Sequence, residues 1–127
     1  MGTSALIRCR VVACPVERGA WEFFLINDSD APLDWAVLTR VAYEWGDFGN
    51  SEDVQVRVPG LAPGAHARIW RDDGDGAELR MELSVQVCIS GREGVLVFEF
   101  PKLYRLTDRL PLIADLGKAG WQVAAEL

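Results

Sequence analysis

The chain has 127 residues, with 19 acidic and 13 basic side chains, and its formal net charge is −6. This length fits one domain with one core, so we expect residues 1–127 to form a single domain. Half of the residues are apolar, which excludes a disordered tail. The acidic excess repels a phosphate backbone, so nucleic-acid binding is not expected.

The compartment is suggested by the first apolar run and by the cysteines. The run Ala5–Val16 is interrupted by two arginines, so it resembles neither a signal peptide nor a membrane span. Cys9 and Cys14, if extended between them, lie roughly 16 Å apart on opposite faces, beyond the ~7 Å limit of a disulfide. An odd third cysteine, Cys88, also argues against a stapled secreted domain. We therefore expect reduced thiols, a cytoplasmic location and no membrane contact.

Hydrophobic periodicity predicts strands along most of the chain. The clearest is Leu79–Ile89, where apolar and polar residues alternate over the whole segment. In chain order, the predicted strands are Ala5–Cys14, Trp21–Ile26, Ala36–Trp45, Val54–Val58, Ala65–Ile69, Leu79–Ile89, Val95–Phe100 and Trp121–Ala125.

Alternation also assigns the faces of two of these strands. In Ala36–Trp45 it places one set of alternating residues on one face, namely Val37, Thr39, Val41, Tyr43 and Trp45, and the other set on the opposite face, namely Ala36, Leu38, Arg40, Ala42 and Glu44. In the strand beginning at Ala65, it directs Ala65, Ala67 and Ile69 to the core and His66, Arg68 and Trp70 to the other side. Trp70 is therefore expected at the surface.

Two predicted strands carry large apolar groups on both faces. In Trp21–Ile26 the surplus face is either Trp21, Phe23 and Leu25 or Phe24 and Ile26. In Val95–Phe100 it is either Leu96, Phe98 and Phe100 or Val95 and Val97. One explanation is a protein interface, for which the candidates are Trp70, Phe24, Phe98 and Phe100. The other is internal cover by Leu103–Leu116, an irregular crossover in which Pro111 interrupts any long helix.

Glycine and proline clusters separate the predicted strands at intervals of roughly ten to fifteen residues. Short strands at this spacing, without a long helical period, indicate an antiparallel all-β fold. We expect a β-sandwich of about seven to nine strands, with one irregular crossover around residues 103–116.

Two turn motifs carry a family resemblance. One strand ends in Leu25-Ile26-Asn27-Asp28-Ser29-Asp30-Ala31-Pro32-Leu33, and a later strand is preceded by Leu61-Ala62-Pro63-Gly64. In this order the motifs resemble bacterial immunoglobulin-like interaction modules, over about residues 20–100. The resemblance implies a seven- or eight-stranded sandwich that binds another macromolecule.

An acidic turn is the candidate cation site. Asp72, Asp73 and Asp75 lie between two predicted strands, and clustered carboxylates on a flexible loop can supply the oxygen ligands that calcium requires. The alternative is an ordinary solvent-facing turn, because Asp and Gly are common turn residues. The sequence leaves both interpretations open.

No catalytic motif is present in the sequence. His66 is the single histidine, and neither a nucleophile elbow nor a phosphate-binding glycine loop accompanies it. We expect no enzymatic activity and no cofactor. The predicted function is a binding or assembly module acting through protein contacts, with a homodimer as the first expectation. A cation- or small-ligand-binding sandwich that uses the acidic turns is the alternative.

Overall fold

Strands form most of the structure. The structure, a computed structural model, describes residues 6–45 and 48–127, so Ala5, where the predicted first strand begins, lies outside the described residues. The elements are β1 (Arg8–Pro15), η1 (Glu17–Gly19), β2 (Trp21–Asn27), β3 (Trp35–Trp45), β4 (Phe48–Val58), β5 (His66–Asp72), η2 (Gly76–Glu78), β6 (Arg80–Ile89), β7 (Arg92–Phe100), η3 (Leu103–Arg109), β8 (Leu112–Ile113), β9 (Lys118–Ala119) and β10 (Trp121–Glu126).

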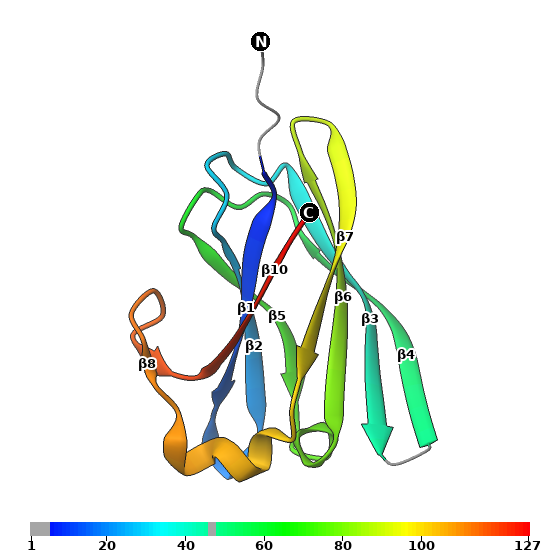
Figure 1. Cartoon of the computed structure of the whole chain (residues 1–127), viewed down its shortest axis with the longest axis vertical. Coiled ribbons are helices and arrows are strands. Elements are labelled where there is room, and N and C mark those ends of the chain that lie inside the picture. Colours follow the sequence, from blue (N-terminus) through cyan, green and yellow to red (C-terminus); the bar gives the residue numbers. More distant parts are fainter. Residues whose placement is uncertain (1–5, 46–47) are drawn as a thin grey trace.

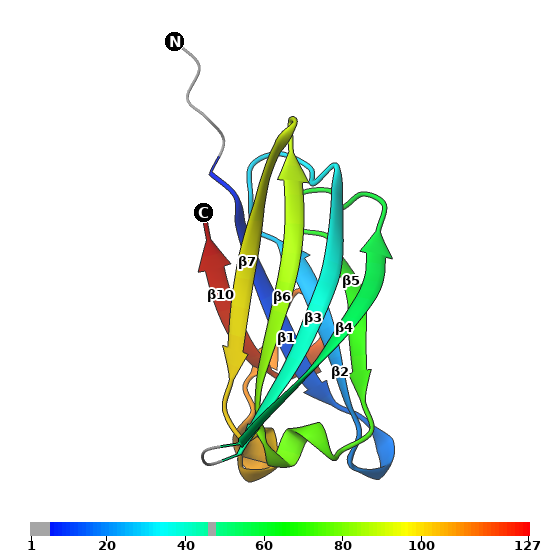
Figure 2. The ribbon, with the colours of Figure 1, turned by 90° about the vertical axis from the view of Figure 1, so that its right-hand side faces the viewer.

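Two antiparallel four-stranded sheets pack face to face (Figures 1 and 2). Their strand orders are β10-β1-β2-β5 and β4-β3-β6-β7, and β8 pairs with β9 in a separate hairpin. Strands cover 62% of the described residues and helices 11%, so the predicted all-β sandwich is confirmed. The eight strands that the described residues place in the two sheets fall within the predicted number.

The main core lies between the two sheets. Leu83 of β6 is directly opposite Val41 of β3 and Phe98 of β7, and all three are fully buried. The predicted inner face of β6 is therefore confirmed. On β7, Phe98 and Phe100 face the core, whereas Val95 and Val97 point outward. Phe98 and Phe100 are thus core residues, which corrects their selection as interface candidates.

A second, smaller core lies on the outer face of β1 and β2. Val12 and Cys14 of β1, together with Phe24 and Ile26 of β2, pack against Ile113 and Leu116 of the β8–β9 hairpin. Phe24 is 9% exposed, and Lys118 Nζ lies 4.8 Å from the centroid of its ring. Phe24 is therefore covered by the crossover and is not a free interface residue. Cys9 packs in the main core, so Cys9 and Cys14 lie on opposite faces, as expected.

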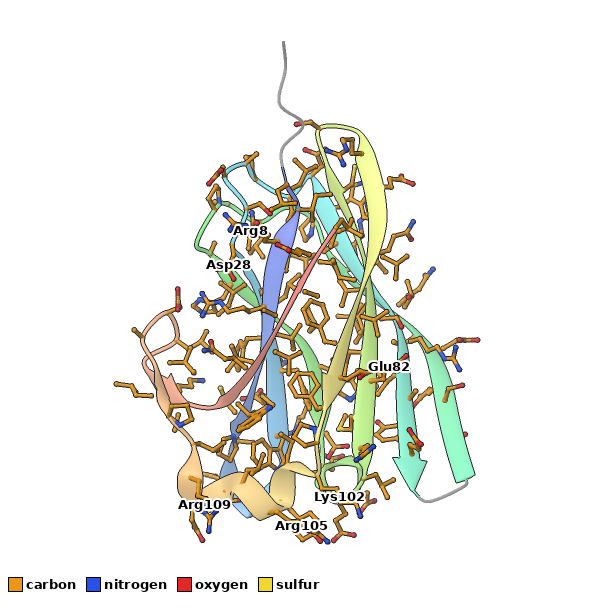
Figure 3. The ribbon with its side chains drawn as sticks, viewed as in Figure 1. Arg8, Asp28, Glu82, Lys102, Arg105 and Arg109 are labelled. Carbon is orange, nitrogen blue, oxygen red and sulfur yellow. The ribbon has the colours of Figure 1, made fainter. Side chains whose placement is uncertain are left out.

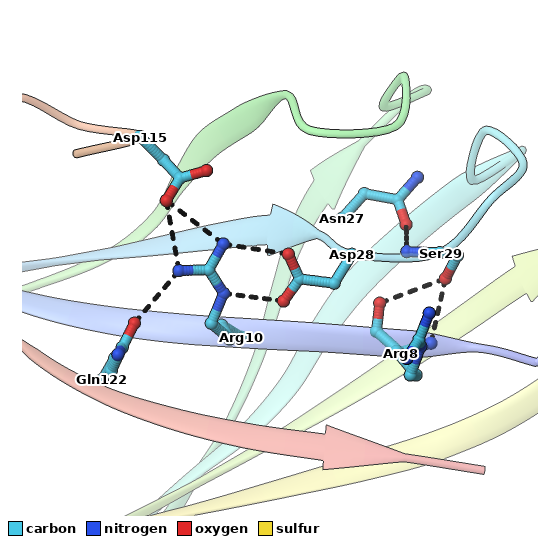
Figure 4. Close-up of polar contacts among 7 residues, drawn as sticks. All are labelled: Arg8, Arg10, Asn27, Asp28, Ser29, Asp115 and Gln122. Carbon is cyan, nitrogen blue, oxygen red and sulfur yellow. Dashed lines mark hydrogen bonds and ion pairs between the residues drawn. The ribbon is translucent and has the colours of Figure 1, made fainter. Parts of the chain in front are cut away.

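A partly buried arginine of β1, Arg10, connects the β8–β9 hairpin to the rest of the sandwich (Figure 4). Arg10 of β1 donates two hydrogen bonds to Asp28, from Nε at 2.7 Å and from Nη2 at 2.9 Å. Its Nη1 also donates to Asp115, between β8 and β9, at 3.2 Å and to Gln122 of β10 at 3.0 Å. Because Arg10 donates to the Asp115 carboxylate, the pKa of Asp115 is held below its ordinary value.

Asn27 joins the two turns that carry the family resemblance. Its side chain is fully buried, and its Nδ2 donates to the carbonyl oxygens of Ala31 at 2.9 Å and Leu61 at 3.0 Å. The backbone N–H of Gly64 donates to the Asn27 carbonyl at 2.7 Å. The buried amide therefore satisfies loop carbonyls that would otherwise lack partners.

A β-bulge in β3 reverses the predicted alternation. Leu38 is opposite Val85 and Arg40 is opposite Ser84, so Thr39 is the extra residue. Val37 consequently lies on the outer face, while Tyr43 reaches the inner face. The prediction that Val37, Thr39 and Tyr43 share one face is wrong because it assumed an unbroken period of two.

A second β-bulge, in β5, also reverses the alternation of side chains between the two faces. Phe24 is opposite Arg68 and Phe23 is opposite Trp70, so the extra residue is Ile69. Trp70 therefore shares the inner face with Phe23, and its predicted position on the polar outer face is wrong.

The 3₁₀ helix η3 closes one end of the sandwich. Its first residue, Leu103, is fully buried in the main core. Figure 3 shows Lys102, Arg105 and Arg109 along this segment at the lower end of the molecule. Within residues 6–45 and 48–127, no helix is both long enough and apolar enough to cross a membrane.

Candidate functional site

The two bulges create a pocket between the edge strands β4 and β5, which Figure 2 shows on the same side of the sandwich. Its volume is about 420 Å³. It spans both sheets, because Tyr43 comes from β3 and Trp70 from β5. The lining consists of Tyr43, Gly49, Asn50, Trp70, Arg71, Asp72, Asp73, Asp75, Gly76 and Leu79.

Tyr43 and Trp70 form the aromatic part of the lining. Both are half-buried and pack against the main core. The indole Nε1 of Trp70 is buried and has no acceptor that meets hydrogen-bond geometry. Burial raises the pKa of Tyr43, and the nearby negative charge of Asp72 raises it further, whereas the nearby indole N–H of Trp70 lowers it, although the two groups do not meet hydrogen-bond geometry. Tyr43 therefore stays a neutral phenol at physiological pH.

Asp72 organises the loop at the base of the pocket. Its carboxylate accepts backbone N–H hydrogen bonds from Gly74 at 3.0 Å, Gly76 at 3.1 Å and Ala77 at 3.1 Å. A Cβ at Gly76 would lie 2.4 Å from Asp72 Oδ1 and 2.4 Å from Tyr43 Cε1. Glycine is required here because the loop backbone approaches both side chains closely. Asp72 is thus a buried, hydrogen-bonded carboxylate that fixes the loop.

Asp73 and Asp75 lie at the rim of the pocket and are exposed. Asp73 forms an ion pair with Arg71 at 3.4 Å, and its side chain is 89% exposed. Since both Asp72 oxygens already accept backbone hydrogen bonds, the three aspartates do not present a shared set of free ligands. Among the described residues, no group of three or more His, Cys, Asp or Glu side chains could hold a metal ion. This geometry favours the alternative of an ordinary turn.

The structure brings four of the sequence candidates together and separates the others. Trp70, Asp72, Asp73 and Asp75 all line the pocket, whereas Phe24, Phe98 and Phe100 are buried elsewhere. Sequence reasoning missed Tyr43, which alternation had grouped with Val37. Among the described residues, the pocket lining contains no serine, cysteine or histidine.

The outer face of β3, β6 and β7 is a second candidate surface. Val95 is 52% exposed and Val97 is 45% exposed, and they are directly opposite Gln86 and Ser84 of β6. Val37 of β3 continues the same row beyond Gln86. We call Val37, Ser84, Gln86, Val95 and Val97 the valine face.

Charged residues surround the valine face. Arg40 and Arg57 lie on the β3 and β4 side, and Glu82 and Glu99 are directly opposite each other at one end. Unlike the outer face of β1 and β2, this face is not covered by any other described segment.

Comparison of this chain with known families, curated proteins and solved structures gives no match in any of the three. The proposed function is therefore based on the geometry of the pocket and of the valine face.

Proposed function

We propose that this chain is a non-enzymatic, immunoglobulin-like binding module, located in the cytoplasm, that assembles through protein contacts. Its first partner is a second copy of the chain. The observation that carries the proposal is the contrast between the two outer faces. The crossover covers the apolar residues of β1 and β2, while Val95 and Val97 remain exposed.

The strand order supports the immunoglobulin-like part of the proposal. Constant-type immunoglobulin sandwiches place their first, second, fourth and fifth strands in one sheet and their third, sixth and seventh strands in the other. In this chain the first seven strands have the same sheet assignment except for the fourth, which pairs with β3. Here β1, β2 and β5 are neighbours in one sheet, and β3, β4, β6 and β7 form the second. β10 extends the first sheet by pairing with β1.

The distribution of charge favours a second copy as the partner. Arg40 and Arg57 lie on the same sheet face as Glu82 and Glu99, so both signs of charge surround the apolar residues. A copy related by a two-fold axis presents both signs again and closes the assembly. A strongly basic or strongly acidic partner would instead meet repulsion from one of the two groups.

The cysteines support the proposed location. Cys9, Cys14 and Cys88 are buried and free of disulfides. Free thiols persist in a reducing compartment, where disulfides are rare.

The oligomeric state tests the proposal directly. Light scattering coupled to gel filtration at several concentrations should give the mass of two chains in the micromolar range, as expected if each chain buries about 800 Å². Val97→Arg should give the mass of one chain, because it places an unpaired charge in the contact. Leu112→Arg is the matched control, since Leu112 is 72% exposed on the opposite outer face.

Two results would overturn the proposal. One is the mass of a single chain at every concentration. The other is a dimer that Leu112→Arg disrupts and Val97→Arg leaves intact, which would move the contact to the crossover hairpin.

A further inference from the structure

We propose that the pocket between β4 and β5 binds an organic cation, specifically a protonated amine attached to a short apolar body. This activity is separate from self-association, because Tyr43 of the pocket lies on the inner face of the β4-β3-β6-β7 sheet, whereas the valine face lies on its outer face.

The size and walls of the pocket suit such a ligand. Its volume of about 420 Å³ falls within the range of small-molecule sites. Tyr43, Trp70 and Leu79 provide apolar surface, and the two aromatic rings can face a cation with their electron-rich sides. Gly49 and Gly76 add no side chains, which leaves the space between the walls open.

The charge of the lining selects the sign of the ligand. Asp72, Asp73 and Asp75 face a single cation, Arg71, in the lining. Arg71 is half-exposed and forms an ion pair with Asp73 at 3.4 Å, and among the described lining residues no other cation lies beside Asp75. The resulting negative potential attracts ammonium groups and repels carboxylates and phosphates.

The effect of Asp72 on Tyr43 agrees with this potential. The charge of Asp72 raises the pKa of Tyr43, so a negative field acts at the aromatic wall of the pocket. Three backbone N–H groups donate to the Asp72 carboxylate and hold it in place beside this wall.

Binding can be followed through the indole N–H resonance of Trp70. In an NMR titration of the whole chain, 2-phenylethylamine should shift this resonance in a saturable manner and leave that of Trp121 in place. Trp70→Phe identifies the signal. The uncharged 2-phenylethanol and the anionic 3-phenylpropionate have similar apolar bodies and should bind more weakly, in that order.

A double variant at the rim tests the role of charge. Asp73→Asn with Asp75→Asn should weaken 2-phenylethylamine binding about fivefold, because two exposed charge contacts are lost. Glu93→Gln with Glu126→Gln changes the net charge equally on β7 and β10, the edge strands far from the pocket, and should leave the affinity unchanged. An unshifted Trp121 resonance in both variants reports that the fold is intact.

A third titration distinguishes the source of the amine. Nα-acetyl-lysinamide presents the same ammonium group as a lysine of a peptide. If this probe binds more tightly than 2-phenylethylamine, the pocket is assigned to peptides. If 2-phenylethylamine binds more tightly, the pocket is assigned to free amines. The proposal is overturned if neither amine shifts the Trp70 resonance, if 2-phenylethanol binds as tightly as its amine, or if the rim and far-edge double variants bind alike.

Discussion

Replacing Leu83 by alanine is the sharpest test of the core. Leu83 is fully buried at the centre of β6, between Val41 and Phe98, which are fully buried as well. Both neighbours belong to strands that are paired in the sheet, so they cannot move far to fill the space left by the side chain. We therefore expect a loss in the upper part of the usual range, about 3–5 kcal/mol of unfolding free energy. For a chain of this size this corresponds to a melting temperature lower by roughly 10–20 °C.

Urea unfolding followed by tryptophan fluorescence measures this loss. Leu83→Ala should move the midpoint to lower urea while leaving the slope of the transition unchanged. Glu82→Ala, one residue away on the outer face, is the matched control and should stay within about 0.5 kcal/mol of the parent. If both variants unfold at the same urea concentration, the assignment of inner and outer faces is wrong.

Two further predictions concern ionisable groups. The pKa of Asp115, measured by NMR, should lie below its ordinary value and should rise when Arg10→Met removes the hydrogen-bond donor. Because the pKa of Asp115 is lower in the folded than in the unfolded state, the stability that this contact contributes is present above about pH 4. This stability is lost as the pH falls through the folded-state pKa. Burial, followed by the charge of Asp28, raises the pKa of Cys9 to about 12, so iodoacetamide at pH 8 should label Cys9 only after unfolding, and rapid labelling of the native chain would contradict its buried position.

Much of the fold was predictable because its strands obey simple alternation. In β6 every second residue from Met81 to Ile89 is buried, and the sequence pattern shows this directly. β2 was harder, because Phe23 and Phe24 are both large and apolar, and periodicity cannot decide which one faces the main core. That decision depends on the β8–β9 hairpin, which lies about ninety residues further along the chain and buries Phe24 through Ile113.

The pocket was not predictable as a unit. Asp72, Asp73 and Asp75 were identifiable as an acidic turn, but Tyr43 was grouped with Val37 on one face and Trp70 was expected on the polar outer face. The cause in both cases is one extra residue, Thr39 in β3 and Ile69 in β5, which shifts all later side chains to the other face. Neither position carries a glycine or proline that would mark a bulge in the sequence.

The pairing of β1 with β10 also has a consequence for synthesis. Arg10 and Gln122 are 112 residues apart in the chain, so at ordinary elongation rates β1 leaves the ribosome roughly 6–20 s before β10. During that interval one edge of β1 has no neighbouring strand, and the apolar residues later covered by the β8–β9 hairpin face solvent. An unpaired edge beside an apolar surface is a template for intermolecular strand pairing. The nascent chain is therefore most prone to aggregate just before residues 112–126 emerge, and a truncation that removes them would make that vulnerable state permanent.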